Sequence, residues 1–133
     1  KIVVINKYIN NKQSFTEKYK QNVSFYSYVK NIDHLYQKTF FSIGACGISL
    51  YEKCFYNIPS ISKCVAVNQK YNFINFSKNH CIMNFDKIIK KNYNTTSKYN
   101  IFYNELKKTK KNIKKNFTLK KNLITLFKIL NER

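Results

Sequence analysis

The residues with the clearest chemical potential lie in one short segment, from Gly44 to Glu52, which contains both glycines of the chain. A turn from a strand into a helix at this point would leave the backbone N–H groups of Gly47, Ile48 and Ser49 free, and the helix dipole favours an anion beside them. Glycine also lets a ligand approach the backbone closely. The segment therefore suggests a phosphate site.

Glu52 lies one helical turn beyond the glycines, where its carboxylate can accept two hydrogen bonds from the hydroxyl groups of a ribose. Ser49 is placed either to cap the helix or to donate to a phosphate oxygen. Two glycines at a strand-to-helix turn also occur for packing alone. By itself, the segment thus admits both a structural and a phosphate-binding interpretation.

The elements that must position this segment follow from the hydrophobic pattern. Short runs of β-branched and aromatic residues alternate with longer mixed stretches, which is typical of an α/β fold with a parallel sheet flanked by helices. Acidic Asp33 in a first turn and Pro59 after a helix agree with this reading. The expected strands are residues 2–8, 23–29, 39–43, 60–67 and 80–83, and the expected helices are 12–20, 31–37, 47–56 and 70–78.

After about residue 84 the β-branched runs thin out and the apolar residues take a helical period, which predicts a helical tail after a polar loop at 92–100. In one tail helix Leu106, Ile113 and Phe117 share a face. Lysines fill the rest of it: Lys107, Lys108, Lys110, Lys111, Lys114 and Lys115. Three interpretations stay open: a surface helix with lysines in water, peripheral contact with a membrane, and contact with nucleic acid.

The formal net charge of +19 would by itself suggest a polyanionic partner. Only Arg133 among the basic residues is an arginine, however, and the chain is also rich in Asn, Ile, Tyr and Phe, whose codons are rich in A and T. A biased base composition therefore explains the lysines without any partner and is favoured over selected binding of a polyanion. Specific recognition of nucleic acid, which favours arginine, is not expected.

The cysteines at 46, 54, 64 and 81 lie in or beside apolar runs and lack metal-ligand spacing. We expect buried thiols, no disulfide, no metal site and a cytoplasmic location. His34 and His80 have no carboxylate at triad-like spacing, so we expect both to be structural. No apolar run is long enough to span a bilayer.

Three blocks of the sequence, in order, resemble the nucleotide-sugar site of the UDP-sugar hydrolase family of pseudaminic acid biosynthesis. They run from Ile43 to Cys54, from Asn57 to Ile61 and from Val67 to Gln69. The family patterns are Ile-Gly-Ala-Gly-Gly-Ser-Thr-Trp-Glu-Arg-Cys, Gly-Leu-Pro-Ser-Ile and Asn-Gln. Residues 22–32 are similar to a further family stretch, and the resemblance extends from about Lys1 to Asp86. The family is related to the lipid II N-acetylglucosaminyltransferase, which shares the GT-B fold.

This resemblance implies that residues 1–90 form an incomplete Rossmann-like nucleotide-sugar-binding domain, the C-terminal domain of a GT-B fold, whose first βα unit would precede Lys1. A helical, lysine-rich extension would cover 91–133. No cofactor is implied. The implied contacts are Val29 with the uracil edge, Gly47, Ile48 and Ser49 with the diphosphate, Glu52 with the ribose hydroxyls, and Asn68 and Gln69 with the sugar. The chain departs from the family at Cys46, Ile48, Tyr51 and Asn57.

The implied activity is hydrolysis of a UDP-linked diacetamido-trideoxyhexose, which releases UDP and the free sugar for nonulosonic acid synthesis. The family's catalytic histidine belongs to a Gly-x-Gly-His motif of an N-terminal domain, and this sequence lacks that motif. We therefore expect no catalytic residue here, an N-terminal catalytic domain as partner, and no activity from this chain alone. The alternatives are a UDP-sugar glycosyltransferase and a non-catalytic module that binds nucleotide sugar or a polyanion.

Overall fold

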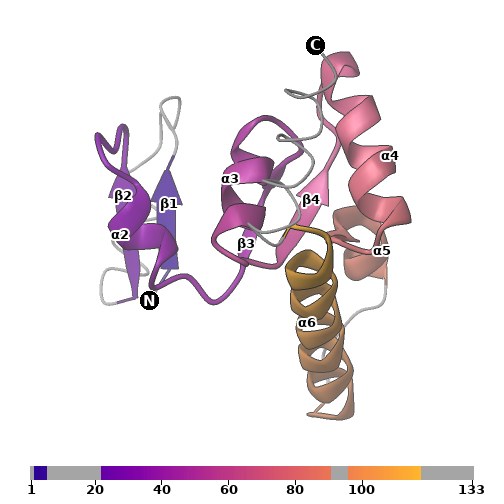
Figure 1. The fold of residues 1–133 in the computed structure, drawn as a ribbon. Coiled ribbons are helices and arrows are strands. Elements are labelled where there is room, and N and C mark those ends of the chain that lie inside the picture. Colours follow the sequence, from indigo (N-terminus) through magenta and orange to yellow (C-terminus); the bar gives the residue numbers. More distant parts are fainter. Residues whose placement is uncertain (1, 6–21, 91–95, 118–133) are drawn as a thin grey trace. The chain divides into compact units, whose positions relative to one another are not determined.

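The computed structural model describes residues 2–5, 22–90 and 96–117. The chain divides between Leu35 and Tyr36 into two compact units. All described strand pairs are parallel, and helices follow the strands along the chain (Figure 1). The expected fold class is thereby confirmed as a small α/β architecture with parallel sheets flanked by helices, consistent with a Rossmann-like fold.

The first unit contains a two-stranded parallel sheet. β1 (Ile2–Ile5) pairs with β2 (Val23–Tyr26), residue for residue in register. β2 ends earlier than the expected 29, so Val29 lies in irregular chain and is half-buried. α2 (Asp33–Tyr36) is a single turn at the boundary between the units, and its first backbone N–H donates to Asn31 Oδ1 at 2.9 Å. This donor is therefore satisfied locally.

The second unit is built on a three-stranded parallel sheet in the order β3-β4-β5. Its strands are β3 (Ser42–Ala45), β4 (Ser60–Lys63) and β5 (Ile82–Asn84). Its helices are α3 (Ser49–Phe55), the short 3-10 helix η1 (Val67–Gln69), α4 (Lys70–Lys78), α5 (Phe85–Lys90) and α6 (Thr96–Asn116). Helical segments therefore separate the strands, as parallel pairing requires.

Two hydrophobic clusters lie on the two faces of this sheet. Neighbouring residues of a strand point to opposite faces, and β5 gives Ile82 to one cluster and Met83 to the other. The first cluster gathers side chains of α3, α4 and α6 with β5: Cys46, Leu50, Cys54, Phe76, Cys81, Ile82 and Ile113. The second consists of Ile61, Met83 and Leu106, with Phe41, Phe85, Ile88 and Phe102 packed against it.

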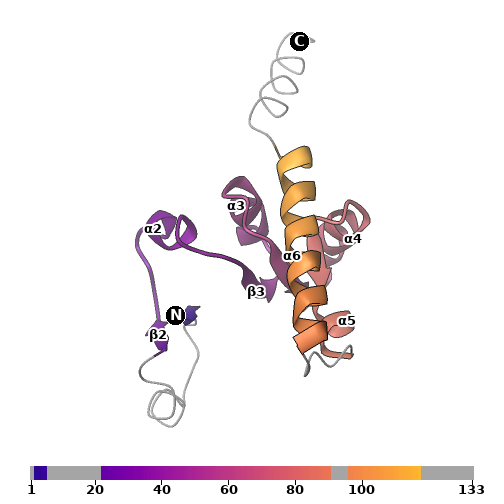
Figure 2. The ribbon, with the colours of Figure 1, turned by 90° about the horizontal axis from the view of Figure 1, so that it is seen from below.

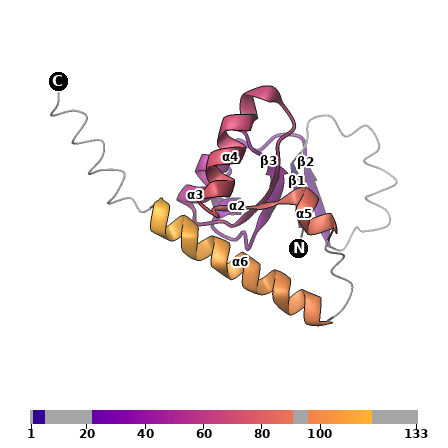
Figure 3. The same cartoon turned by 90° about the vertical axis from the view of Figure 1, so that its right-hand side faces the viewer.

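α6 contributes one buried side chain to each cluster. Near its start Phe102 packs edge to face on Phe41, just before β3, with ring centroids 6.0 Å apart. Near its end Asn112 Nδ2 donates to the carbonyl oxygen of His80, just before β5, at 3.3 Å. α6 therefore lies across the amino ends of the strands (Figures 1 and 2), and Figure 3 shows it along its length at the margin of this unit.

The third strand was predicted at 39–43 but occupies Ser42–Ala45. Phe40 and Phe41 precede the strand and pack on aromatic rings of α6, and the Phe40 ring stacks on Tyr103 at 6.0 Å. Gly44 instead continues the ladder opposite β4. The prediction was wrong at this boundary because Phe40 and Phe41 pack against α6 and do not pair with β4.

The remaining boundaries differ from the predictions for other reasons. The strand predicted at 60–67 ends at Lys63, and Val65 and Val67 beyond it are exposed. The strand predicted from residue 80 begins at 82, because His80 has a φ of 53° in the turn that ends α4. The helix predicted at 70–78 is confirmed, whereas those at 31–37 and 47–56 are shorter than predicted.

The tail is helical where it is described. Residues 96–100, predicted as loop, form the first turns of α6, so that prediction was wrong. Leu106 and Ile113, which were predicted to share a face with Phe117, are buried, and Phe117 follows the helix and packs against the first cluster. The helix predicted at 12–20 lies outside the described residues. Among the helices the structure describes, none has the length and apolar character that a bilayer span needs.

Burial of the thiols is confirmed at Cys46, Cys54 and Cys81, while Cys64 is only partly buried; all four are free thiols. Burial raises the pKa of the Cys54 thiol to about 12 and also raises the pKa of Cys46 and Cys81. Three of the cysteines therefore behave as small apolar core residues at neutral pH.

Candidate functional site

The carboxyl ends of β3, β4 and β5 meet at one edge of the sheet, because the strands are parallel. In open α/β sheets ligands bind in the loops beyond this edge. The turn after β3 contains Gly47 and Ile48, with Ser49 as the first residue of α3, and η1 after β4 contains Asn68 and Gln69. The sequence-predicted residues of the second unit therefore lie in or directly after the loops of this carboxyl edge.

The turn after β3 begins the bonding pattern of α3. The N–H of Leu50 donates to the Gly47 carbonyl at 3.0 Å, and that of Tyr51 to the Ile48 carbonyl at 2.9 Å. Ile48 is the N-cap residue and has no side-chain cap, so Ser49 does not cap this helix. Within the described part of the chain, the N–H groups of Gly47, Ile48 and Ser49 have no acceptor. These backbone donors remain available to a ligand.

The structure brings together two of the predicted residues, Gly47 and Gln69. A Cβ atom added to Gly47 would lie 3.9 Å from Gln69 Nε2. The oxygen of the same side-chain amide is also fixed, because Gln69 Oε1 accepts a hydrogen bond from the backbone N–H of Val65 at 3.2 Å. Neither glycine of the chain has a positive φ, so backbone conformation does not require glycine here. Asn68 precedes Gln69 in η1 and is exposed.

Glu52 is positioned by Tyr36. The Tyr36 hydroxyl donates to Glu52 Oε2 at 3.3 Å, while the Tyr36 ring packs on Tyr56 with centroids 5.4 Å apart. Tyr36 is only 8% exposed, whereas Glu52 is exposed. Burial, and after it the carboxylate of Glu52, raises the pKa of Tyr36 to about 12. The bond holds one carboxylate oxygen of Glu52 and leaves the group open to solvent.

The raised pKa of Tyr36 predicts alkaline destabilisation. The unfolded chain releases this proton near pH 10 and the folded chain only near 12, so the stabilising contribution of the neutral tyrosine is complete below pH 10 and is lost as pH rises through 12. We expect the urea midpoint of the wild-type chain to fall more steeply over this interval than that of Tyr36→Phe. Equal slopes for the two proteins would contradict the assignment.

Sequence reasoning missed two further residues: Asn72, which is bonded to this turn, and Lys53, which lies beside Gly44 of β3. Asn72 lies in α4, and its Oδ1 accepts a hydrogen bond from the Tyr51 hydroxyl at 2.9 Å. Its Nδ2 donates to the carbonyl oxygen of Cys46 at 3.2 Å. A Cβ added to Gly44 would lie 3.4 Å from Lys53 Nζ. Burial lowers the pKa of the Lys53 amine. No sequence signal distinguishes these residues in a chain so rich in lysine and asparagine.

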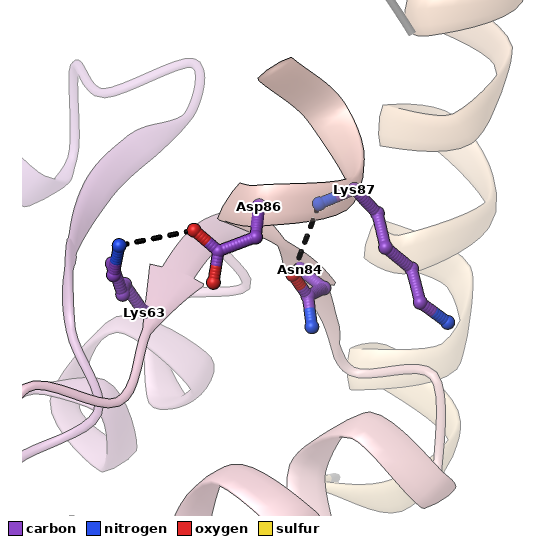
Figure 4. Close-up of polar contacts among 4 residues, drawn as sticks. All are labelled: Lys63, Asn84, Asp86 and Lys87. Atoms are coloured by element: carbon purple, nitrogen blue, oxygen red, sulfur yellow. Dashed lines mark hydrogen bonds and ion pairs between the residues drawn. The ribbon is translucent and has the colours of Figure 1, made fainter. Parts of the chain in front are cut away.

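Polar contacts tie the ends of β4 and β5 to the start of α5 (Figure 4). Lys63 Nζ lies 3.0 Å from Asp86 Oδ1, with half of each side chain exposed. Asn84 Oδ1 accepts the N–H of Lys87 at 3.1 Å, which satisfies one donor at the start of α5. An exposed ion pair contributes little stability. This pair therefore serves mainly to orient two side chains at the carboxyl edge.

Other features belong to other parts of the chain. Val29 belongs to the first unit. A cavity of about 220 Å³ lies between α4 and the end of α6, lined by Asn75, Phe76, Asn79, Cys81, Asn116 and Phe117. His34 and His80 are exposed, the first in α2 and the second in a turn. Among the residues described, no cluster of His, Cys, Asp and Glu side chains is suited to hold a metal ion.

The fold is that of a small α/β protein with parallel strands. Its polar loops cluster at the carboxyl ends of the strands of one sheet. Comparison with known family models, curated proteins and solved structures finds no match to this chain. Any function must therefore be argued from the residues at the carboxyl edge and from the sequence resemblance.

Proposed function

We propose that this chain is the UDP-binding part of a GT-B-type hydrolase of the cytoplasm, which cleaves a UDP-linked diacetamido-trideoxyhexose. The observation that carries the proposal is the approach of Gln69 to Gly47, two residues from separate resembling blocks, at the carboxyl edge of the sheet. Backbone N–H groups without an acceptor among the described residues lie in the same turn. Glu52 follows within α3.

These groups suit the parts of a nucleotide diphosphate sugar. Backbone N–H groups favour the diphosphate, a carboxylate such as that of Glu52 favours ribose hydroxyls, and the amides of Asn68 and Gln69 favour a neutral sugar. In the proposed reaction water attacks the anomeric carbon, the bond from that carbon to the phosphate oxygen breaks, and UDP departs with the bonding electrons. A base from the N-terminal catalytic domain takes the proton of the water, and the turn stabilises the departing UDP.

Titration of the chain with UDP, by calorimetry or NMR, tests the proposal. Gly47→Ala places a methyl group in the space beside Gln69 without a clash, so we expect unchanged thermal stability and about tenfold weaker UDP binding. Gly44→Ala is the matched control, because its methyl group would meet Lys53 Nζ and not the turn. Its affinity for UDP should equal that of the wild type.

Two outcomes would overturn the proposal. One is failure of the wild-type chain to bind UDP at millimolar concentration. The other is displacement of UDP by single-stranded DNA with equal loss in both glycine variants, which would indicate a general polyanion-binding module. If UDP binds as expected, the upstream sequence separates hydrolase from transferase, because only the hydrolase family has the Gly-x-Gly-His motif.

A further inference from the structure

α6 presents one continuous basic face. The six lysines between positions 107 and 115 are all exposed: Lys107, Lys108, Lys110, Lys111, Lys114 and Lys115. No acidic residue occurs in that stretch. At a rise of about 1.5 Å per residue the lysines extend over about 12 Å of helix. This lysine face is therefore a dense and uniformly positive surface.

Such a face is unfavourable for an isolated helix. Lys107 and Lys111, like Lys110 and Lys114, are four residues apart on one side, and like charges at this spacing repel each other. The helix is nevertheless held in place, because Leu106 and Ile113 are buried in the two clusters of the sheet. A bound anionic surface would relieve the repulsion without any change in the fold.

The apolar side of α6 is already used. Leu106, Thr109 and Ile113 are 3%, 5% and 0% exposed, so they cover the sheet and are not available to lipid acyl chains. A helix that inserts into a membrane interface buries its apolar face in the lipid. Any docking through α6 must therefore be electrostatic, with the helix on the surface and its lysines toward the anions.

We propose that the lysine face of α6 binds an anionic phospholipid surface in this way. Clusters of four to eight basic residues on a helix suit anionic lipid headgroups, and lysine, as a hydrated point charge, suits a diffuse negative surface. Nucleic acid is less favoured, because its readers use arginine forks and free aromatic rings. The Tyr103 ring of α6 is already stacked on Phe40 and lies under Lys107 Nζ at 4.4 Å.

The proposal is independent of the nucleotide site. α6 lies across the amino ends of the strands, whereas Gly47 and Gln69 lie beyond their carboxyl ends. Docking through α6 would therefore leave the carboxyl edge facing away from the lipid headgroups (Figure 1). Nucleotide binding and lipid binding should be separable by mutation.

The test is flotation of the whole chain with vesicles of phosphatidylcholine alone or mixed with phosphatidylglycerol. We expect binding only to the mixed vesicles and its loss at high salt. Replacing Lys108, Lys111 and Lys115 with Gln should weaken binding about a hundredfold. Replacing the exposed Lys70, Lys78 and Lys87 with Gln removes the same charge elsewhere and should weaken binding far less.

Several results would overturn the proposal: no binding to the mixed vesicles, binding that persists at high salt, or equal losses in the two triple variants. Binding of an RNA oligonucleotide that depends on the same three lysines, with no vesicle binding, would assign the lysine face to nucleic acid. Circular dichroism should show that both variants remain folded, because all six substituted positions are exposed.

Discussion

Replacing Ile113 with Ala should lower the free energy of unfolding by about 3 kcal/mol. Ile113 is fully buried and is the residue through which the end of α6 enters the cluster formed with α3, α4 and β5. Truncation removes apolar contacts and leaves a void between elements that cannot close it without moving the sheet. Urea denaturation followed by circular dichroism gives the change directly.

Ile101→Ala is the matched control for this prediction. It removes the same atoms from the same helix, but Ile101 is 50% exposed. Its effect should stay within about 0.5 kcal/mol. Similar losses from the two substitutions would contradict the prediction, because Ala favours a helix more than Ile does and the difference in burial would then not decide the effect.

Replacing Glu52 with Ala should weaken UDP binding about thirtyfold, which corresponds to about 2 kcal/mol for hydrogen bonds to a charged carboxylate. The prediction rests on the proposed function. Glu52 is exposed on α3 and keeps its carboxylate open to solvent, so its removal should cost affinity and little stability. Calorimetric titration of the wild type and the variant measures the effect.

Tyr36→Phe tests how much the orientation of the Glu52 carboxylate contributes, apart from its charge. It removes only the hydroxyl that donates to Glu52 Oε2 at 3.3 Å and leaves the charge in place. We expect a loss of UDP affinity of about threefold, much smaller than for Glu52→Ala. An unchanged affinity in Glu52→Ala, with normal UDP binding by the wild type, would exclude Glu52 as the ribose acceptor.

Local patterns predicted several elements well. The helix at Lys70–Lys78 was placed correctly, because the residues on both sides of it interrupt the helical spacing of the apolar residues. The burial of Leu106 and Ile113 followed from their helical spacing, and that of Cys54 from its place in an apolar run. Strand ends were less certain, since Val65 and Val67 have strand propensity but lie exposed in the loop that leads into η1.

The candidate site, too, was predicted only in part from the sequence. The turn that contains Gly47 lies after a strand and before a helix, as the sequence predicts, whereas Gly44 belongs to the strand itself. The proximity of Gly47 to Gln69, the Tyr36 bond to Glu52 and the role of Asn72 are contacts between separate elements. No periodicity within one segment encodes such contacts. The assignment of Val29 to a nucleotide stays a prediction.

The sequence by itself determined that this chain alternates short apolar strands with helices, has a glycine at a strand-to-helix turn, and contains a later helix with an apolar stripe and many lysines. Only the tertiary structure decided where that stripe goes. Packing of α6 across the amino ends of β3, β4 and β5 buries the stripe and leaves the lysines exposed. Hydrophobic spacing specifies that a face must be covered, but the covering partner is chosen by shape and by contacts far apart in the chain.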